Sequence, residues 1–89
     1  MKCSIGMFAK SKAGHDKSKV YLISKIDDEY VYLVDGVIRT VDKPKKKSKK
    51  HIQIDYQIMD FIQVKIEVQQ ELRNEEIKRA IKLKQAASR

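Results

Sequence analysis

Lysine is the residue type in this sequence with the clearest chemical use. Six of the eight residues from 43 to 50 are lysine, which makes this run the most densely charged part of the chain. A second and looser group consists of Lys10, Lys12, Lys17 and Lys19. Lysine ammonium groups bind phosphate oxygens without reading base sequence, and a polyanionic partner relieves the repulsion between neighbouring ammonium groups. The two basic segments therefore predict contacts with the phosphate backbone of a nucleic acid.

Two histidines and an arginine extend this prediction. His15 lies inside the first basic segment, and His51 ends the second, where an imidazole can contact phosphate or stack on a base. Arg39 precedes the second segment and offers the planar guanidinium fork that lysine lacks. The residues predicted to contact RNA are Lys10, Lys12, His15, Lys17, Lys19, Arg39, Lys43, Lys45, Lys46, Lys47, Lys49, Lys50 and His51.

The lysine run at 43–50 is expected to be a loop that is mobile in the free protein and becomes ordered along a phosphate backbone. Pro44 favours an extended start to this loop. Two other interpretations stay open, a loop that only keeps the protein in solution and a nuclear import signal. Because the charge is of one sign, contact with nucleic acid is the preferred interpretation.

Length and charge set the scale of the protein. The chain has 89 residues and a formal net charge of +8, which suits one small domain with a terminal appendage. Residues 1–54 hold thirteen Lys and Arg against six Asp and Glu, whereas residues 55–89 hold seven against six. No apolar run approaches the roughly 20 residues that cross a bilayer, and no apolar signal-peptide core follows the first residues. We therefore expect a cytoplasmic protein that does not act at a membrane.

The residue types argue against catalysis and cofactor chemistry. The sequence holds no Ser-His-Asp or Cys-His set and no phosphate-binding glycine loop, so it is not expected to be an enzyme or to bind a small-molecule substrate. Cys3 is the only cysteine, which excludes an internal disulfide and a cysteine metal cage. With only His15 and His51 as further soft ligands, no metal or other cofactor is predicted. The tyrosines are assigned to packing, and none is predicted to contact a base.

Alternating apolar residues predict a mainly β protein. Aspartate and glycine at 35 and 36 stand between two apolar runs, which is a strong signal for a two-residue hairpin turn. Residues 20–41 are therefore expected to form a meander of three strands, and a small β-barrel of about five strands follows from the whole pattern. The expected strands span residues 5–9, 20–26, 30–34, 37–41 and 51–56.

The second of these strands shows the alternation clearly. Val20, Leu22 and Ile26 are expected on one face of the strand, and Tyr21 and Ile23 on the other. Both faces are apolar, so the strand should be packed on both sides.

The C-terminal part is predicted to be an extension at 58–89, after a barrel at 1–57. Residues 58–70 fit both strand and helix periodicity, with a preference for helix or irregular structure because the barrel already has its strands. A helix is predicted at about 75–87, with Asn74 as its N-cap and two glutamates in its first turn.

Residues 11–36 resemble the KOW motif of ribosomal proteins and transcription elongation factors. The basic stretch ending in His51 and Ile52 and the acidic start of the helix after Asn74 make the resemblance narrower. More narrowly, the chain is similar to bacterial KOW-domain RNA-binding proteins and to the archaeal and eukaryotic large-subunit ribosomal protein fourteen family. The family usually has glycine where this chain has Ser18, so the loop around that position is expected to be remodelled.

The resemblance implies an SH3-like β-barrel with a C-terminal helix that binds RNA through its loops and strand edges. The expected partner is ribosomal RNA or the large ribosomal subunit, with contacts to ribosomal proteins. A protein-interaction module of the transcription or translation machinery is the alternative, in which the lysines serve only solubility. Non-specific binding of duplex DNA is a third possibility.

Overall fold

The computed structural model describes residues 3–12 and 19–87 of the chain. Five strands and two α-helices form most of this part, with one short 3-10 helix between the last two strands. In chain order the elements are β1 (Phe8–Ser11), β2 (Tyr21–Ile26), β3 (Tyr30–Val34), β4 (Lys45–Ser48), η1 (Lys49–His51), β5 (Ile52–Asp55), α1 (Asp60–Glu67) and α2 (Asn74–Ala87).

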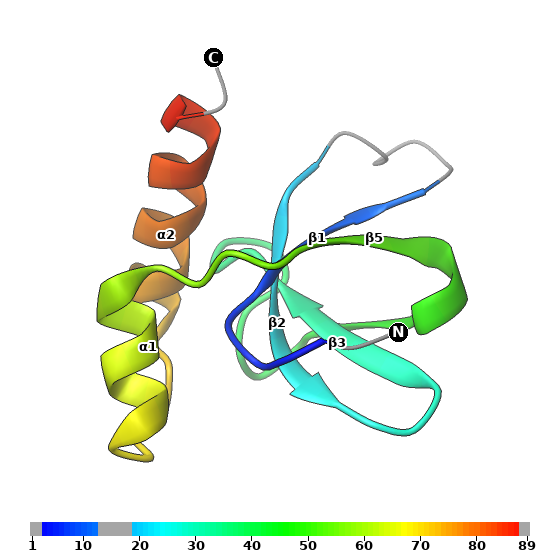
Figure 1. Cartoon of the computed structure of the whole chain (residues 1–89), viewed down its shortest axis with the longest axis horizontal. Coiled ribbons are helices and arrows are strands. Elements are labelled where there is room, and N and C mark those ends of the chain that lie inside the picture. Colours follow the sequence, from blue (N-terminus) through cyan, green and yellow to red (C-terminus); the bar gives the residue numbers. More distant parts are fainter. Residues whose placement is uncertain (1–2, 13–18, 88–89) are drawn as a thin grey trace.

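The five strands form one open, strongly curled antiparallel sheet in the order β4-β3-β2-β1-β5 (Figure 1). β4 and β5 are its two edges, yet only the three residues of η1 connect them. In a flat sheet these edges would be about 19 Å apart, because neighbouring strands are about 4.8 Å apart. The chain from Ser48 to Ile52 spans at most about 15 Å. The sheet must therefore curl until its edges approach each other at η1.

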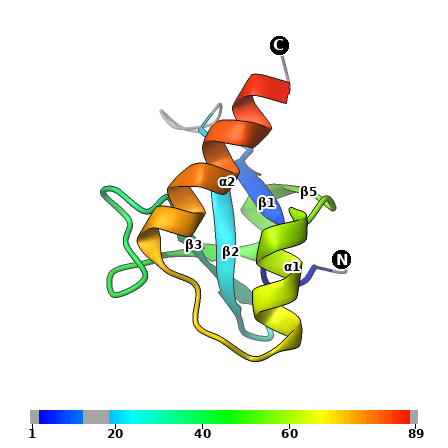
Figure 2. The same cartoon turned by 90° about the vertical axis from the view of Figure 1, so that its left-hand side faces the viewer.

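Both faces of the curled sheet are covered by apolar side chains, as the alternation in β2 predicts. On the outer face the two helices pack against the sheet, and α2 lies across β2 (Figure 2). The side chains of the inner face pack against one another inside the curl, and neither α1 nor α2 covers them. The core under the helices consists of Phe8, Val20, Leu22, Val34, Ile62, Ile77, Ala80 and Ile81. The core inside the curl consists of Ala9, Tyr21, Ile23, Val31, Leu33 and Ile52.

A β-bulge in β2 changes the face on which Ile26 lies. Ile23 pairs with Leu33, but the next pair joins Lys25 to Tyr32, so Ser24 is an extra residue. The Ser24 hydroxyl donates a hydrogen bond of 3.2 Å to the Tyr32 carbonyl. One extra residue reverses the faces that follow it. Ile26 therefore packs in the inner core with Ile23, and its predicted place beside Val20 and Leu22 is wrong.

The predicted strand at 37–41 does not form, and the aspartate and glycine at 35 and 36 do not make a two-residue hairpin. The Asp35 carboxylate accepts hydrogen bonds from the backbone N–H groups of Val37 (2.8 Å) and Arg39 (2.9 Å), which folds the segment into a compact loop. Val37 and Ile38 are consequently 65% and 73% exposed. The free edge of β3 pairs instead with β4, the lysine run.

The C-terminal predictions are largely confirmed. α1 shows that part of the ambiguous segment 58–70 is helical, and α2 forms where a helix was predicted. Asn74 is the first residue of α2 rather than its N-cap, and its side chain accepts a hydrogen bond of 3.0 Å from the Val41 N–H. Glu76 instead closes the helix start, because its carboxylate accepts from the Arg73 N–H at 2.9 Å.

Replacing Gly36 with alanine is expected to destabilise the protein by about 2 kcal/mol. Gly36 has a φ of +81°, and a Cβ atom there would lie 2.5 Å from the backbone oxygen of Asn74. Gly6→Ala is the matched control, because Gly6 also has positive φ but its nearest obstacle is the flexible end of Ile66. Thermal unfolding should rank Gly36→Ala as the more harmful change. Equal melting temperatures would contradict a tight contact between this loop and α2.

Candidate nucleic-acid interface

The densest lysine run forms an edge strand, not the mobile loop that was expected. Lys45, Lys46 and Lys47 belong to β4, which pairs with β3 on one side only. Lys45 and Lys47 pair with Leu33 and Val31, so their side chains lie at the rim of the inner face. Lys46 points to the opposite face. Lysines on an edge strand also prevent pairing with another sheet.

The basic residues after β4 continue around the corner between the two sheet edges. Lys50 and His51 lie in η1 and are exposed. The end of β1 is joined to this corner, since the backbone N–H of Lys12 donates to the His51 carbonyl at 2.9 Å. The exposed Lys12 therefore lies beside the second basic segment. We call the combined surface the basic edge, and it consists of Lys12, Lys45, Lys46, Lys47, Lys50 and His51.

Most lysines of the basic edge have no ion-pair partner among the described residues. Lys12, Lys46, Lys47 and Lys50 form no ion pair with any residue in the ranges 3–12 and 19–87. Ammonium groups held close together on a strand and a short helix repel one another, and a polyanion that lies along them removes this repulsion. The basic edge is thus a surface on which phosphate groups would be bound favourably.

Two other predicted lysines are engaged inside the protein. The Lys49 ammonium donates a hydrogen bond of 2.9 Å to the Asp28 carbonyl, and the Lys49 N–H donates to the Glu29 carbonyl. Lys49 therefore fastens η1 to the turn between β2 and β3. Lys19 pairs with the Asp35 carboxylate at 2.6 Å. Both residues have a structural role that their position in the sequence did not reveal.

The remaining predicted residues lie apart from the basic edge or outside the description. Lys10 is exposed on β1 opposite Gln53, on the face that also carries the helices. Lys43 is exposed in the turn that precedes β4, where its N–H donates to the Thr40 carbonyl at 3.0 Å. The predicted contacts His15 and Lys17 lie outside the described residues.

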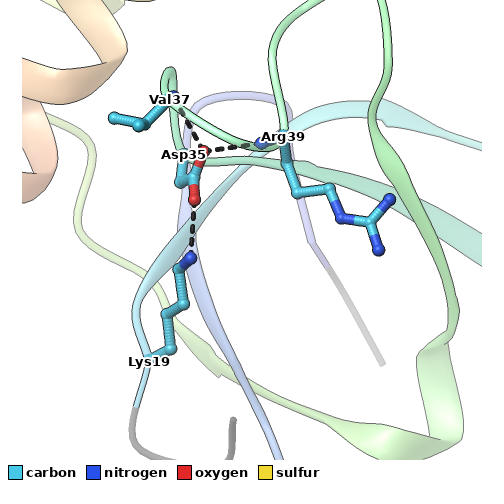
Figure 3. A network of polar contacts seen from close by, with 4 residues as sticks. All are labelled: Lys19, Asp35, Val37 and Arg39. Carbon is cyan, nitrogen blue, oxygen red and sulfur yellow. Dashed lines mark hydrogen bonds and ion pairs between the residues drawn. The ribbon is translucent and has the colours of Figure 1, made fainter.

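Asp35 organises the loop that carries Arg39 (Figure 3). Its carboxylate is only 6% exposed, and it binds the two backbone N–H groups and the Lys19 ammonium. Burial by itself would raise the pKa of Asp35, but the hydrogen bonds from Lys19, Val37 and Arg39 outweigh it, so the pKa lies below its ordinary value. The guanidinium of Arg39 points away from this network (Figure 3).

Two tyrosines on β3 were missed as candidate site residues. Tyr30 and Tyr32 flank the buried Val31, so they point to the opposite face, and Lys46 and Lys25 lie over their rings. The hydroxyl of Tyr32 donates to the Asp27 carboxylate at 3.0 Å, and this hydrogen bond raises the pKa of the Tyr32 phenol. Strand alternation around Val31 was the signal that could have placed both rings outside the core.

Comparison with known proteins does not assign the chain to a family: no protein-family model matches it, and no curated protein matches it significantly. In residues 3–12 and 19–87, no group of three or more His, Cys, Asp or Glu side chains could hold a metal ion. Within the same ranges no helix has the length and apolar character needed to span a membrane.

Proposed function

We propose that this protein binds RNA through the basic edge. The observation that carries the proposal is the row of lysines on β4 and η1, most of which have no ion-pair partner in the described part of the chain. Each phosphate that such a lysine neutralises releases condensed counterions, which drives association and makes it sensitive to salt. Because lysine acts as a point charge, these contacts give affinity and position but no base sequence.

We further propose that the curled sheet is an SH3-like barrel of the KOW type and that the RNA is ribosomal. The curl that brings β4 and β5 together at η1 supports the barrel. The resemblance of residues 11–36 to the KOW motif supports the ribosomal partner. In this proposal the protein is cytoplasmic and binds the large ribosomal subunit, with the lysines along its ribosomal RNA.

Co-sedimentation with ribosomes in sucrose gradients tests this function. At low salt the tagged protein should travel with the large subunit, and at several-fold higher salt it should stay at the top of the gradient, because phosphate contacts weaken steeply with salt. A protein that stays at the top at every salt concentration would contradict ribosome association.

A second candidate function is binding to a protein, and the loop after β3 favours it. Val37 and Ile38 are exposed on a loop that Asp35 holds in shape, and together with Ile81 they line an open groove of about 370 Å³ beside α2. Exposed apolar side chains on a fixed loop are typical of protein contacts. Ribosome association that survives neutral replacements in the basic edge but is lost in a Val37→Ser/Ile38→Ser variant would favour this function over RNA binding.

A further inference from the structure

One row of side chains crosses the outer face of the sheet from β2 to β4. The registers pair Lys25 with Tyr32 and Tyr32 with Lys46, so these three side chains lie side by side on the same face. Tyr30 and its partner Ser48 form the next row. Two tyrosines and two lysines therefore share this face over three neighbouring strands, and neither tyrosine belongs to the core under the helices.

The lysines lie over the tyrosine rings. The Lys46 ammonium is 4.3 Å from the centre of the Tyr30 ring, and the Lys25 ammonium is 5.3 Å from the centre of the Tyr32 ring. Tyr30 is 37% exposed, and the hydrogen bond to Asp27 fixes the ring of Tyr32. Aromatic rings and cations on one face of a sheet are the combination that binds single strands, because bases stack on the rings and phosphates contact the cations. A base that stacks on either ring takes the place of the ammonium group over it, and the long lysine side chain can turn toward the neighbouring phosphate.

We propose that Tyr30 and Tyr32 are a stacking platform for unpaired bases of single-stranded RNA, with Lys25 and Lys46 on the phosphates that flank those bases. This inference rests on the proposed RNA binding and names its ligand class. Bases inside a duplex are stacked on each other and do not offer their faces to a ring, so the platform selects unpaired over paired RNA. Lys46 belongs to both the platform and the basic edge, which makes the two surfaces continuous.

The acidic turn beside the platform limits where a phosphate can lie. The Asp27 carboxylate accepts the hydrogen bond of the Tyr32 hydroxyl, which orients the ring and leaves the carboxylate charged. The Lys49 ammonium donates to the Asp28 carbonyl and so places one positive charge within the turn. Phosphates of a bound strand are therefore expected on the lysine side of the rings and away from the turn, which Lys49 neutralises only in part.

A comparison of single-stranded and duplex RNA tests the platform. The probe is a fluorescent, unstructured RNA of about 12 nucleotides, alone or annealed to its complement. A Tyr30→Leu/Tyr32→Leu variant is expected to bind the single strand about tenfold or more weakly while its affinity for the duplex changes by less than about twofold. Tyr56→Leu is the matched control, because Tyr56 is 59% exposed but lies just after the opposite edge strand, and it should change neither affinity.

Two further variants separate stacking from misfolding. Tyr30→Phe keeps the ring and should keep the affinity of the native protein. Because the sequence has no tryptophan, Tyr30→Trp introduces a single reporter whose fluorescence should be quenched by the single strand and not by the duplex.

The platform would be overturned if the Tyr30→Leu/Tyr32→Leu variant lost equal affinity for both RNA forms. It would also be overturned if the Tyr30→Trp variant bound the single strand without quenching of its tryptophan fluorescence. Either result would leave RNA binding through the basic edge intact. Absence of binding by the native protein to either RNA form would instead overturn the proposed function itself.

Discussion

Replacing Lys46, Lys47 and Lys50 together with glutamine is expected to weaken RNA binding by about 100-fold at about 0.1 M salt. These three ammonium groups lie on β4 and η1 without an ion pair in the part of the chain that the structure describes. Each lost phosphate contact removes its share of counterion release, so the slope of log affinity against log salt should also become shallower by about 2. Fluorescence anisotropy with a ribosomal RNA fragment over a salt series measures both quantities.

The matched control removes the same charge from another surface. The control variant combines Lys78→Gln, Arg79→Gln and Lys82→Gln. These three residues lie on the exposed side of α2, and replacing them lowers the net charge by the same amount. This variant should keep most of its affinity and its salt slope. If both triple variants bind equally weakly, the overall charge of the protein governs binding, and the basic edge has no special role.

Replacing Asp35 with alanine is expected to destabilise the folded protein by about 3 kcal/mol. The substitution removes the acceptor of the Val37 and Arg39 N–H groups and the partner of Lys19. It also frees the loop that contacts the start of α2 through Gly36 and Val41. Denaturant unfolding followed by circular dichroism measures the change.

The Asp35→Asn variant and a pH series separate the two contributions of Asp35 to stability, its hydrogen bonds and its charge. The amide keeps an oxygen for the two N–H groups and loses only the charge, so Asp35→Asn should cost less than Asp35→Ala. Because the pKa of Asp35 is lowered by folding, its carboxylate stabilises the protein above its ordinary pKa of 3.8, and this stabilisation is lost as the pH falls through the lower folded value. The difference between native protein and Asp35→Ala should therefore narrow in acid. A difference that does not depend on pH would show that the charge of Asp35 contributes nothing.

The elements with strong local patterns could be predicted from the sequence. β2, β3 and α2 form where alternation or helical spacing placed them. The partner of β3 could not be predicted, because lysine is a poor strand former and residues 37–41 have the better pattern. The side chain of Asp35 decides this competition, since it takes the N–H groups that a strand at 37–41 would need for pairing. β4 then pairs with the edge of β3 that a strand at 37–41 would have occupied.

The candidate site was predictable as a set of charges but not as an arrangement. The density of lysine at 43–50 identified four residues of the basic edge, and Lys12 joins them only through the pairing of the end of β1 with His51. Which ammonium groups are already engaged depends on contacts between distant parts of the chain, such as Lys49 with the Asp28 carbonyl. The lysines over Tyr30 and Tyr32 likewise depend on a register that only the folded sheet defines. The sequence shows which residues are charged, and the fold determines which of the ammonium groups are accessible to a partner.

RNA binding through the basic edge is tested most directly by the affinity of the purified native protein for a ribosomal RNA fragment as salt is raised. The five lysines of the basic edge should give measurable binding at low salt and a slope of log affinity against log salt of about −3.5, because each neutralised phosphate contributes about −0.7. Absence of binding in dilute buffer, or an affinity that does not change with salt, would contradict the claim that lysines on β4 and η1 bind RNA through its phosphates.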